Sequence, residues 1–462
     1  MTRLYTKREL LQDASAAGFG LLLSSSPGVG NVTLFTPQSP SFNQLRQGFN
    51  ERIDKYPKVI AVCHNANGVT DAVNYAAKNR LSVAIRSGGH SFEGFSCNNG
   101  GLVINLSQLN QIEWLNSTTV RVGPGVTLSH LYDALLPHKR IVPTGSCGGV
   151  GIAGLALGGG YGFFSRSYGL TCDSLLDVTM VDSRGVVHRG ASEPDLLWAC
   201  RGGGNGSFGV VTEMVFKTHP APSSFRSYRF KLGGLDGPKA AHLLENWFTL
   251  AAELPRSCFS AFVLNSKGLV ILITDFEAPT PQLRRQLERA GSMARSSSTG
   301  RPQNLAAALK VYYGRPGPLS FKNSSGGMYR GFDDVRGCAV AMLNLVTSHP
   351  GLMYQVNTLG GSIADPGFGA ASCFPHRSRP FLSELQSYWS TPAQEANLHK
   401  AFRQVQNLLL QNGVTAHYAN YPDLEFTDWQ HAYYGASYPR LQAIKRRYDP
   451  GNLFQHEQSV RA

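Results

Sequence analysis

A glycine-flanked histidine is the first feature of this chain that could do chemistry. The residues Arg86-Ser87-Gly88-Gly89-His90-Ser91 follow an apolar run at 81–85 that predicts a strand. Two glycines let the backbone curve until successive N–H groups face one anion, and Arg86 adds positive charge. The hexapeptide favours a phosphate-binding turn with His90 beside the bound group, although a plain glycine turn with an exposed histidine explains the same six residues.

A second stretch gathers glycines around a cysteine. Nine of the 50 glycines lie between Gly145 and Gly162, and Cys147 stands near the start of this stretch. Positions without a Cβ let the backbone approach a ligand closely, so the stretch predicts a backbone surface pressed against a flat molecule. A third segment, 195–212, predicts a helix, a glycine-rich loop and a strand, and it indicates another close approach of backbone to a cofactor.

Two other interpretations of the second stretch are open but weaker. Residues 149–154 match the dinucleotide-binding pattern G-x-G-x-x-G, yet no convincing buried strand precedes them. Residues 145–149 match the elbow of a hydrolase with Cys147 as nucleophile, to which a histidine later in the chain would have to contribute the base. Three glycines at 158–160 oppose the helix that must follow such an elbow.

The elements that position these motifs alternate between helices and short β-rich runs. Expected helices cover 71–78, 281–295 and 439–448, and expected strands cover 81–85, 103–106, 178–181 and 269–273. The Gly/Ser/Pro-rich residues 314–327 are expected to form a loop, and residues 220–224 to mark a domain boundary.

Composition excludes several classes of protein. Of the 462 residues, 42% are hydrophobic and 16% are charged, which allows a sizeable core and argues against disordered and coiled-coil proteins. The net charge is +13, but the one tight basic cluster, 445–447, fits a solvated helix face, so we predict no nucleic-acid partner. A general attraction for anionic ligands remains open. No run approaches the ~20 apolar residues of a membrane span.

The eight cysteines bear on metals and on the compartment. None forms a CxxC pair, so we predict no metal site. They are too sparse for a disulfide framework, and one or two bridges would suit an exported protein. Lys7 and Arg8 precede a mildly apolar run at 14–23, which resembles a twin-arginine signal and predicts export to the periplasm or medium. An ordinary amphipathic first helix in a cytoplasmic protein is the alternative.

Taken together, the motifs resemble one family, the berberine-bridge-enzyme-like FAD-linked oxidases of the vanillyl-alcohol-oxidase superfamily. The resemblance covers roughly 35–462. The matching residues are Arg86 to Ser91, Cys147 to Gly162, Tyr168 to Leu170, Asp195 to Thr212, Phe374 to Arg377, Tyr418 to Asp423, Tyr433 to Gly435 and Lys445 to Gln458.

The resemblance implies an α+β fold with a two-lobed FAD-binding domain of the PCMH type. An inserted substrate domain of antiparallel sheet backed by helices would complete the active site. The implied boundaries are 1–32 for the export signal, 33–220 for the FAD-binding domain, 221–410 for the substrate domain and 411–462 for the segment that returns to the FAD-binding domain.

The resemblance also implies how the cofactor is held. In the family, the histidine of the first motif bonds to the flavin 8α carbon and the cysteine of the second bonds to C6, so His90 and Cys147 imply a doubly tethered FAD. The implied cofactor-binding residues are Arg86, Ser87, Gly88, Gly89, His90, Ser91, Cys147, Gly148, Gly151, Gly158, Gly159, Gly209, Val211 and Asn420.

The implied reaction removes a hydride from a carbon next to a hydroxyl or amine, with O₂ as the common final acceptor and H₂O₂ as product. Tyr418 and Glu384 are the two candidates for the base, and Gln386 remains an alternative to Glu384. Tyr168 is implied to lie on the substrate side. Leu155 replaces a histidine found in many plant members, which leaves oxidase and dehydrogenase both open.

The substrate class is the least defined expectation. We expect a sugar, an oligosaccharide or a glycosylated natural product. An aromatic alcohol or alkaloid is the alternative substrate, and a flavin-bearing binding protein without turnover is the alternative of another class.

Overall fold

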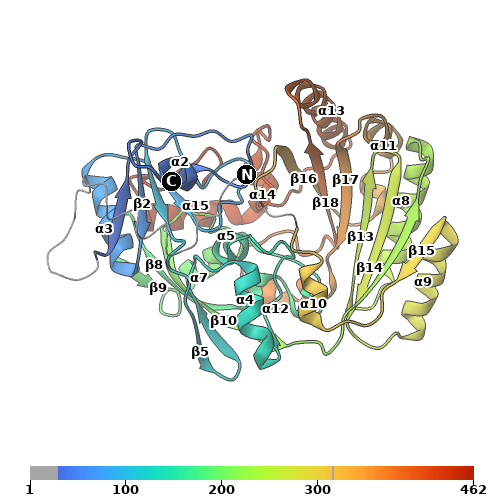
Figure 1. Ribbon diagram of the computed structural model, residues 1–462, viewed down its shortest axis with the longest axis horizontal. Coiled ribbons are helices and arrows are strands. Elements are labelled where there is room, and N and C mark those ends of the chain that lie inside the picture. Colours follow the sequence, from blue (N-terminus) through green and yellow to red (C-terminus); the bar gives the residue numbers. More distant parts are fainter. Residues whose placement is uncertain (1–29, 315–316) are drawn as a thin grey trace.

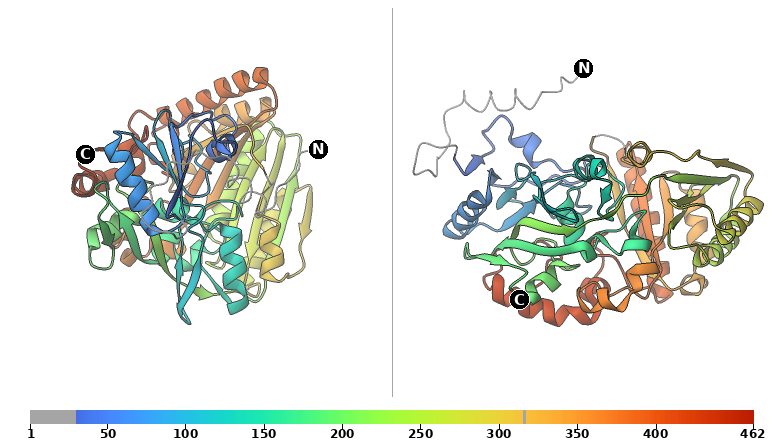
Figure 2. Two further views of the ribbon diagram at one scale, coloured as in Figure 1. Left: turned by 60° about the vertical axis from the view of Figure 1, so that its left-hand side comes forward. Right: turned by 90° about the horizontal axis from the view of Figure 1, so that it is seen from below.

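The computed structural model describes residues 30–314 and 317–462. Residues 1–29, which hold nearly all of the expected export signal, lie outside the described residues. The chain forms two lobes that lie side by side (Figure 1). One lobe contains three sheets from the first half of the chain, and the other contains a single large sheet; the view from below in Figure 2 separates them clearly.

The first sheet of the first lobe carries the histidine motif at its edge. Its strand order is β1-β2-β4-β3, and β2, β4 and β3 are parallel. The bounds are β1 Val32–Phe35, β2 Val59–Cys63, β3 Val83–Arg86, β4 Leu102–Asn105, α2 Phe42–Arg46 and α3 Ala66–Lys78. The apolar stripe of α3 is buried in a core with β2, β3 and β4. Residues 87–91, which contain His90, therefore directly follow the carboxyl end of β3.

The second sheet is antiparallel and has the order β5-β6-β10-β8-β9. The bounds are β5 Ile112–Asn116, β6 Thr119–Val122, β8 Leu175–Val181, β9 Val187–Arg189, β10 Val210–Lys217, α4 Leu128–Leu135, α5 Ile152–Leu157, α6 Ser165–Tyr168 and α7 Pro194–Cys200. A two-stranded ribbon pairs β7 Arg140–Ile141 with β11 His219–Pro220. The glycine stretch 145–162 runs from the end of this ribbon through α5.

The second lobe is a seven-stranded antiparallel sheet of order β15-β12-β14-β13-β17-β18-β16. The strand bounds are β12 Arg226–Leu232, β13 Cys258–Asn265, β14 Gly268–Asp275, β15 Ser296–Thr299, β16 Phe321–Tyr329, β17 Leu352–Thr358 and β18 Phe381–Tyr388. Its helices are α8 Gly237–Ala252, α9 Pro281–Met293, α10 Leu305–Lys310, α11 Ala339–Ser348, α12 Pro366–Ala370 and α13 Pro392–Gln411. Helices α8, α9, α11 and α13 cover the sheet face that points away from the first lobe (Figure 1), and the core of this lobe lies between them and the sheet. The opposite face is left for the site.

The expectation of a loop over 314–327 is wrong for 321–327, because Phe321–Tyr329 forms the buried edge strand β16, whereas residues 317–320 belong to no named strand or helix. Its small residues allow close packing: Ser324 Oγ accepts a hydrogen bond of 2.6 Å from Gln406 of α13, and the N–H of Ser325 donates to the Tyr421 carbonyl. Gly327 has φ +117° at a register shift of the β16–β18 pair. The composition that indicates a loop here serves tight contacts instead.

The C-terminal segment returns to the first lobe. Helices α14 Trp429–Tyr434 and α15 Tyr438–Tyr448 pack there, and Phe454 forms a parallel bridge with Val83 beside β3. The buried Lys445 ammonium donates to the Ser207 and Phe454 carbonyls and to Asp449.

A buried ion cluster joins the two lobes. Lys322 of β16 donates to Glu93 (3.2 Å) and to Asp423 (2.8 Å), and Arg52 pairs with the second oxygen of Glu93 (2.7 Å). Burial alone would lower the pKa of Lys322, but the two carboxylates raise it above its ordinary value. The lysine is therefore held charged inside the interface between lobes.

The observed architecture confirms the α+β class. The first lobe contains separate parallel and antiparallel sheets, and the second lobe is an antiparallel sheet backed by helices. The expected helices and strands are present with bounds that shift by at most five residues. All eight cysteines are free thiols, so none of them forms a disulfide. Within residues 30–314 and 317–462, no helix is both long and apolar enough to cross a membrane.

Candidate active site

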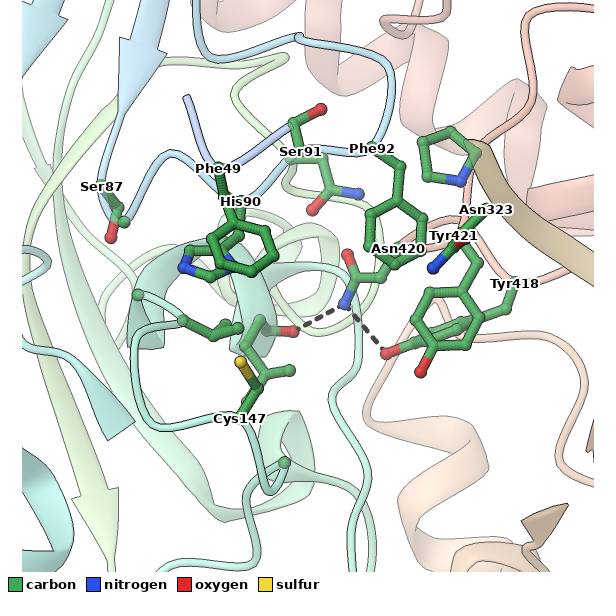
Figure 3. A pocket seen from close by; sticks show the side chains of 18 of the residues that line it. Phe49, Ser87, His90, Ser91, Phe92, Cys147, Asn323, Tyr418, Asn420 and Tyr421 are labelled. Atoms are coloured by element: carbon green, nitrogen blue, oxygen red, sulfur yellow. Dashed lines mark hydrogen bonds between the residues drawn. The ribbon is translucent and has the colours of Figure 1, made fainter. Parts of the chain in front are cut away.

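A cavity of about 760 Å³ lies between the lobes. One wall comes from the turn 87–91, the glycine stretch and residues 205–211, and the facing wall comes from the free face of the seven-stranded sheet. Figure 3 shows His90 and Cys147 on one side, Tyr418 and Tyr421 on the other, and Asn420 between them. The cavity therefore brings together motifs that lie more than 300 residues apart in the chain.

The histidine turn is built to receive an anion. The N–H groups of residues 88–91 donate to no partner among the described residues. Gly89 has φ +71°, and the partly buried Arg86 guanidinium packs directly against it, where a Cβ at Gly89 would lie 2.9 Å from Nη2. Arg86 Nη1 is itself buried without a hydrogen-bond partner. Free N–H groups beside a partly buried cation form a suitable cradle for phosphate oxygens.

Close backbone contact fixes the position of the two glycine motifs relative to each other. A Cβ at Gly151 would lie 2.5 Å from the Gly88 nitrogen and would also overlap Ser87 Oγ. Gly158 is restricted in the same way, because a Cβ there would meet Asn205 Oδ1 at 2.7 Å and overlap Asn420 Oδ1. Glycines therefore let neighbouring segments meet closely at this wall, which suits the approach of a flat ring system.

His90 and Cys147 line this wall. The His90 imidazole stacks on Phe49, with ring centroids 4.3 Å apart and planes inclined by 17°. Burial, together with Arg86, lowers the pKa of His90 to about 4, so the imidazole is neutral at pH 7. Burial raises the pKa of the partly exposed Cys147 thiol, against the opposing effect of the Gly149 and Val150 N–H groups.

The Tyr418 hydroxyl is held by two donors. Its oxygen accepts hydrogen bonds from the Gly160 N–H (2.8 Å) and from Asn420 Nδ2 (2.9 Å), and Asn420 also donates to the Leu155 carbonyl. Burial raises the pKa of this phenol above its ordinary value, and the two donors only partly offset that rise. The hydroxyl proton is therefore retained at neutral pH, where the phenol serves as a donor.

Glu384 of β18 points into the cavity from the sheet. It is only 7% exposed, and Asn323 Nδ2 lies 3.4 Å from Oε1. Burial raises the pKa of this carboxyl to about 8, and hydrogen bonds from Asn323, Gln386 and Tyr421 oppose the rise. Because strand residues alternate between faces, Gln386 lines the same cavity. A carboxyl with a pKa near neutral is suited to proton transfer.

A chain of hydrogen bonds crosses the sheet from Gln386. Gln386 donates to Gln355 (3.2 Å), Gln355 donates to Asn357 (2.8 Å), and Asn357 donates to the Tyr161 hydroxyl (3.0 Å). The Tyr161 and Tyr421 hydroxyls then lie 2.8 Å apart. These groups come from β17, β18, the glycine stretch and the C-terminal segment. Together they form the floor of the cavity, a hydrogen-bonded surface with several donors and acceptors.

The predicted site residues fall into three groups. Most of them line the cavity, namely Ser87, Gly88, Gly89, His90, Ser91, Cys147, Gly151, Gly209, Val211, Glu384, Tyr418 and Asn420. A second group lies just behind the wall, namely Arg86, Gly148, Gly158 and Gly159. Within this group, Gly159 has φ +122°, and a Cβ there would lie 3.3 Å from the Tyr418 ring.

Tyr168 is the exception and requires a correction. It does not line the cavity; its ring stacks on His219 at 4.6 Å, and its hydroxyl lies 3.4 Å from the Pro220 carbonyl. Helix α6 ends at Gly169, which has φ +87°, and Tyr168 lies beside the two-stranded ribbon. Tyr161, which ends the glycine stretch, occupies the substrate side instead.

Sequence reasoning did not find the polar residues of the sheet wall, which are Asn323, Gln355, Asn357 and Tyr388. Only one signal was available for them. In β17 the residues Gln355 and Asn357 alternate with apolar ones within a buried strand, which indicates a polar face turned toward a ligand.

The wall of the first lobe fits an FAD. The unpaired N–H groups above Arg86 suit the pyrophosphate, and the backbone surface of the glycine stretch suits the flavin ring. The neutral His90 imidazole and the Cys147 thiol both reach that surface.

Comparisons with known proteins agree with this fit. The FAD binding domain family matches residues 57–191, and the berberine and berberine-like family matches residues 417–461. An uncharacterized FAD-linked oxidoreductase from Bacillus subtilis is 29% identical over 445 residues, which cover 92% of this chain and 96% of the relative. A chitooligosaccharide oxidase from Gibberella zeae is 28% identical over 455 residues, covering 92% and 91%. The solved structure of Physcomitrella patens BBE-like 1 has a TM-score of 0.85 at 24% identity and covers 98% of both chains.

Proposed function

The chain belongs to the berberine-bridge-enzyme-like FAD-linked oxidoreductases, and we propose that it oxidises a CH–OH carbon of a sugar, an oligosaccharide or a glycosylated natural product. The observation that carries this proposal is the position of Glu384. Its carboxyl, with a pKa near 8, faces the same cavity as His90 and Cys147. The amide groups of Gln355, Gln386 and Asn357 beside it match the hydroxyl groups of a carbohydrate.

The cofactor attachment proposed here is double and covalent, through His90 and Cys147. Both side chains lie on the wall that fits the flavin, and a Cβ at Gly149 would lie 3.1 Å from His90 Nε2, so the two motifs meet there. The low pKa of His90 leaves a ring nitrogen lone pair free at neutral pH. Two attachment points would hold the ring while the sheet side stays open to a bulky substrate.

We propose that Glu384 is the base and that Tyr418 orients the substrate. Bound FAD supplies the acceptor for the hydrogen and electron pair that leave the substrate carbon. The Glu384 carboxylate takes the hydroxyl proton, because its pKa lies near the working pH. Tyr418, which keeps its proton and is held by Gly160 and Asn420, donates to the substrate oxygen and orients it. We propose O₂ as the final acceptor, with H₂O₂ as product.

The attachment is tested by denaturing the purified holoenzyme in acid. We expect the yellow colour to stay with the precipitated protein. His90→Ala and Cys147→Ala alone should each leave the flavin attached, and the double variant should release it to the supernatant. Free FAD released from the denatured wild-type protein would overturn the double attachment.

The activity is tested by anaerobic mixing of the holoenzyme with sugars, oligosaccharides and aromatic alcohols. Bleaching of the flavin absorbance by a carbohydrate is the expected result, followed by H₂O₂ formation when air is admitted. Bleaching by aromatic alcohols alone would replace the carbohydrate by an aromatic alcohol as the proposed substrate. Bleaching by none of the compounds would favour a binding protein without turnover.

We also propose export through the twin-arginine-like signal at the N-terminus. Its Lys7-Arg8 pair and the following apolar run support this proposal. The secreted protein should begin near residue 30 by N-terminal sequencing, and Lys7→Gln with Arg8→Gln should retain the protein in the cytoplasm. Recovery of exported protein with its first residues intact would count against it.

A further inference from the structure

We propose that a small cavity beside the substrate cavity is a subsite for a carboxylate, lined by Arg229 and Arg301, so that the substrate is an alcohol with an anionic end. This inference rests on the proposed function, because it defines the substrate of the same site. A second cavity of about 130 Å³ is lined by both arginines together with Ser227, Gln303 and Tyr312. Tyr312 also lines the large cavity, so the two spaces share one wall.

The sheet register places Arg229 on the substrate face. Arg229 pairs with Leu272, Leu272 pairs with Ala261, and Ala261 pairs with Asn357. Paired residues of antiparallel strands point to the same face, and the last three of this row line the large cavity. Adjacent strands lie about 4.8 Å apart, so three steps put Arg229 roughly 14 Å from Asn357.

The polarity of the cavity surface changes along this row of paired residues, from Asn357 to Arg229. Near Glu384 the cavity floor carries amides and hydroxyls, whereas β13 and β14 present Phe259, Ala261, Val263 and Leu272. In β12 the row reaches the Arg229 guanidinium, and Ser298 of the edge strand β15 lies beyond it. A ligand that matches this order has a hydroxyl at the reacting end, an apolar face in the middle and an anion at the far end.

Both guanidinium groups are free to bind an anion. Among the described residues, neither Arg229 nor Arg301 forms an ion pair with a carboxylate. Arg229 donates one N–H to the Tyr312 hydroxyl at 3.1 Å, and Ser227 Oγ holds the same hydroxyl at 2.7 Å. The tyrosine ring is thereby fixed between the cavities, and the remaining N–H groups of Arg229 form a fork that fits a carboxylate.

The test compares two probes of equal size. One is cellotriose, and the other is cellotriose whose non-reducing glucose is oxidised at C6 to the uronate. Binding to the dithionite-reduced holoenzyme is measured by calorimetry without air, since the reduced flavin cannot take electrons from the probe. We expect the uronate to bind roughly tenfold tighter at low salt, and this preference should shrink as salt screens the charge.

Arg229→Gln should reduce the preference to about twofold or less, because it removes the charge and the fork. Arg226→Gln is the matched control: it removes an equal charge from the same strand, but neighbouring strand residues point to opposite faces, so the preference should persist. If Arg229→Gln does not fold, Arg301→Gln must lower the preference by about threefold instead. Equal affinities in the wild type, a preference that survives both arginine variants, or binding of neither probe would overturn the subsite.

Failure of the subsite and failure of the proposed function give different results. A holoenzyme whose flavin is bleached equally well by cellotriose and its uronate retains the proposed function and loses the subsite. A holoenzyme that prefers the uronate, but whose flavin no alcohol bleaches, loses the proposed oxidation and keeps the subsite.

Discussion

The two walls of the cavity are built in opposite ways. The wall of the first lobe depends on glycines at close contacts: Gly88 and Gly151 bring main chain against main chain, and Gly89 leaves room for the Arg86 guanidinium. The sheet wall consists of single side chains, such as Asn323, Gln355 and Glu384, with at most three from each strand. The comparison teaches that the shape of the cofactor wall is fixed by whole segments, whereas the chemistry of the substrate wall can change one residue at a time.

The largest effect should come from a single atom change in the sheet wall. Glu384→Gln removes the proposed base and keeps the shape of the side chain, so anaerobic flavin reduction should slow by about 10²–10⁴ while the flavin content stays unchanged. Stopped-flow absorbance measures this rate. Tyr418→Phe should slow the reaction less, because it removes a donor only; a larger loss in Tyr418→Phe than in Glu384→Gln would assign the base to Tyr418.

The pH dependence of the flavin-reduction rate tests whether Glu384 is the base. A base acts in its ionised form, and burial raises the pKa of Glu384 from 4.5 to about 8. The wild-type reduction rate should therefore rise about tenfold per pH unit below that value and level off above it. Glu384→Gln should lose this rise. A wild-type rate that is flat between pH 6 and 9 would exclude a titrating base in this range.

An intermediate effect is expected for backbone contact in the first wall. Gly151 has an ordinary φ of −76°, so Gly151→Ala tests only the clash of the new Cβ with Ser87 and Gly88. We expect the free energy of unfolding to fall by about 1–3 kcal/mol and the flavin content to drop. Gly233→Ala, where a Cβ meets no atom within 4 Å, is the control and should change stability by less than about 0.5 kcal/mol. Equal behaviour of the two variants would contradict a wall built by close backbone contact.

The smallest effect should come from the hydrogen-bonded floor. Gln355→Leu breaks the bonds from Gln386 and to Asn357, each worth about 0.5–1.5 kcal/mol. The KM of a carbohydrate substrate should rise several-fold, with little change in the limiting rate of flavin reduction or in flavin content, as steady-state and stopped-flow kinetics would show. An unchanged KM would remove Gln355 from substrate binding.

The contrast between the two cavity walls explains how much of the site could be predicted from the sequence. His90, Cys147 and the turns around them lie in contiguous segments whose glycine spacing is visible in one dimension, and the structure brings them to one cavity. Glu384 could be proposed only through its spacing from a family motif. Asn323 sits in β16, where its serine and glycine neighbours indicate a loop although packing against α13 makes a buried strand.

Tyr168 shows the converse limit of sequence reasoning. The family resemblance implies that Tyr168 lies on the substrate side, but the structure places Tyr161 there. Tyr161 reaches the cavity and Tyr168 reaches His219, a difference set by the three-dimensional course of α6. Spacing along the chain carries no information on that direction.

The ion cluster of Lys322 has a consequence for recombining such enzymes. The lysine comes from the sheet, whereas its partners Glu93 and Asp423 come from segments on either side of the sheet in the sequence. Grafting a foreign sheet without a cation at this position would leave Asp423 buried without a cation and Glu93 paired with Arg52 alone, at a cost of about 3–5 kcal/mol. Chimeras that exchange substrate lobes should therefore inherit Lys322, Glu93 and Asp423 as one unit, whatever substrate the new lobe brings.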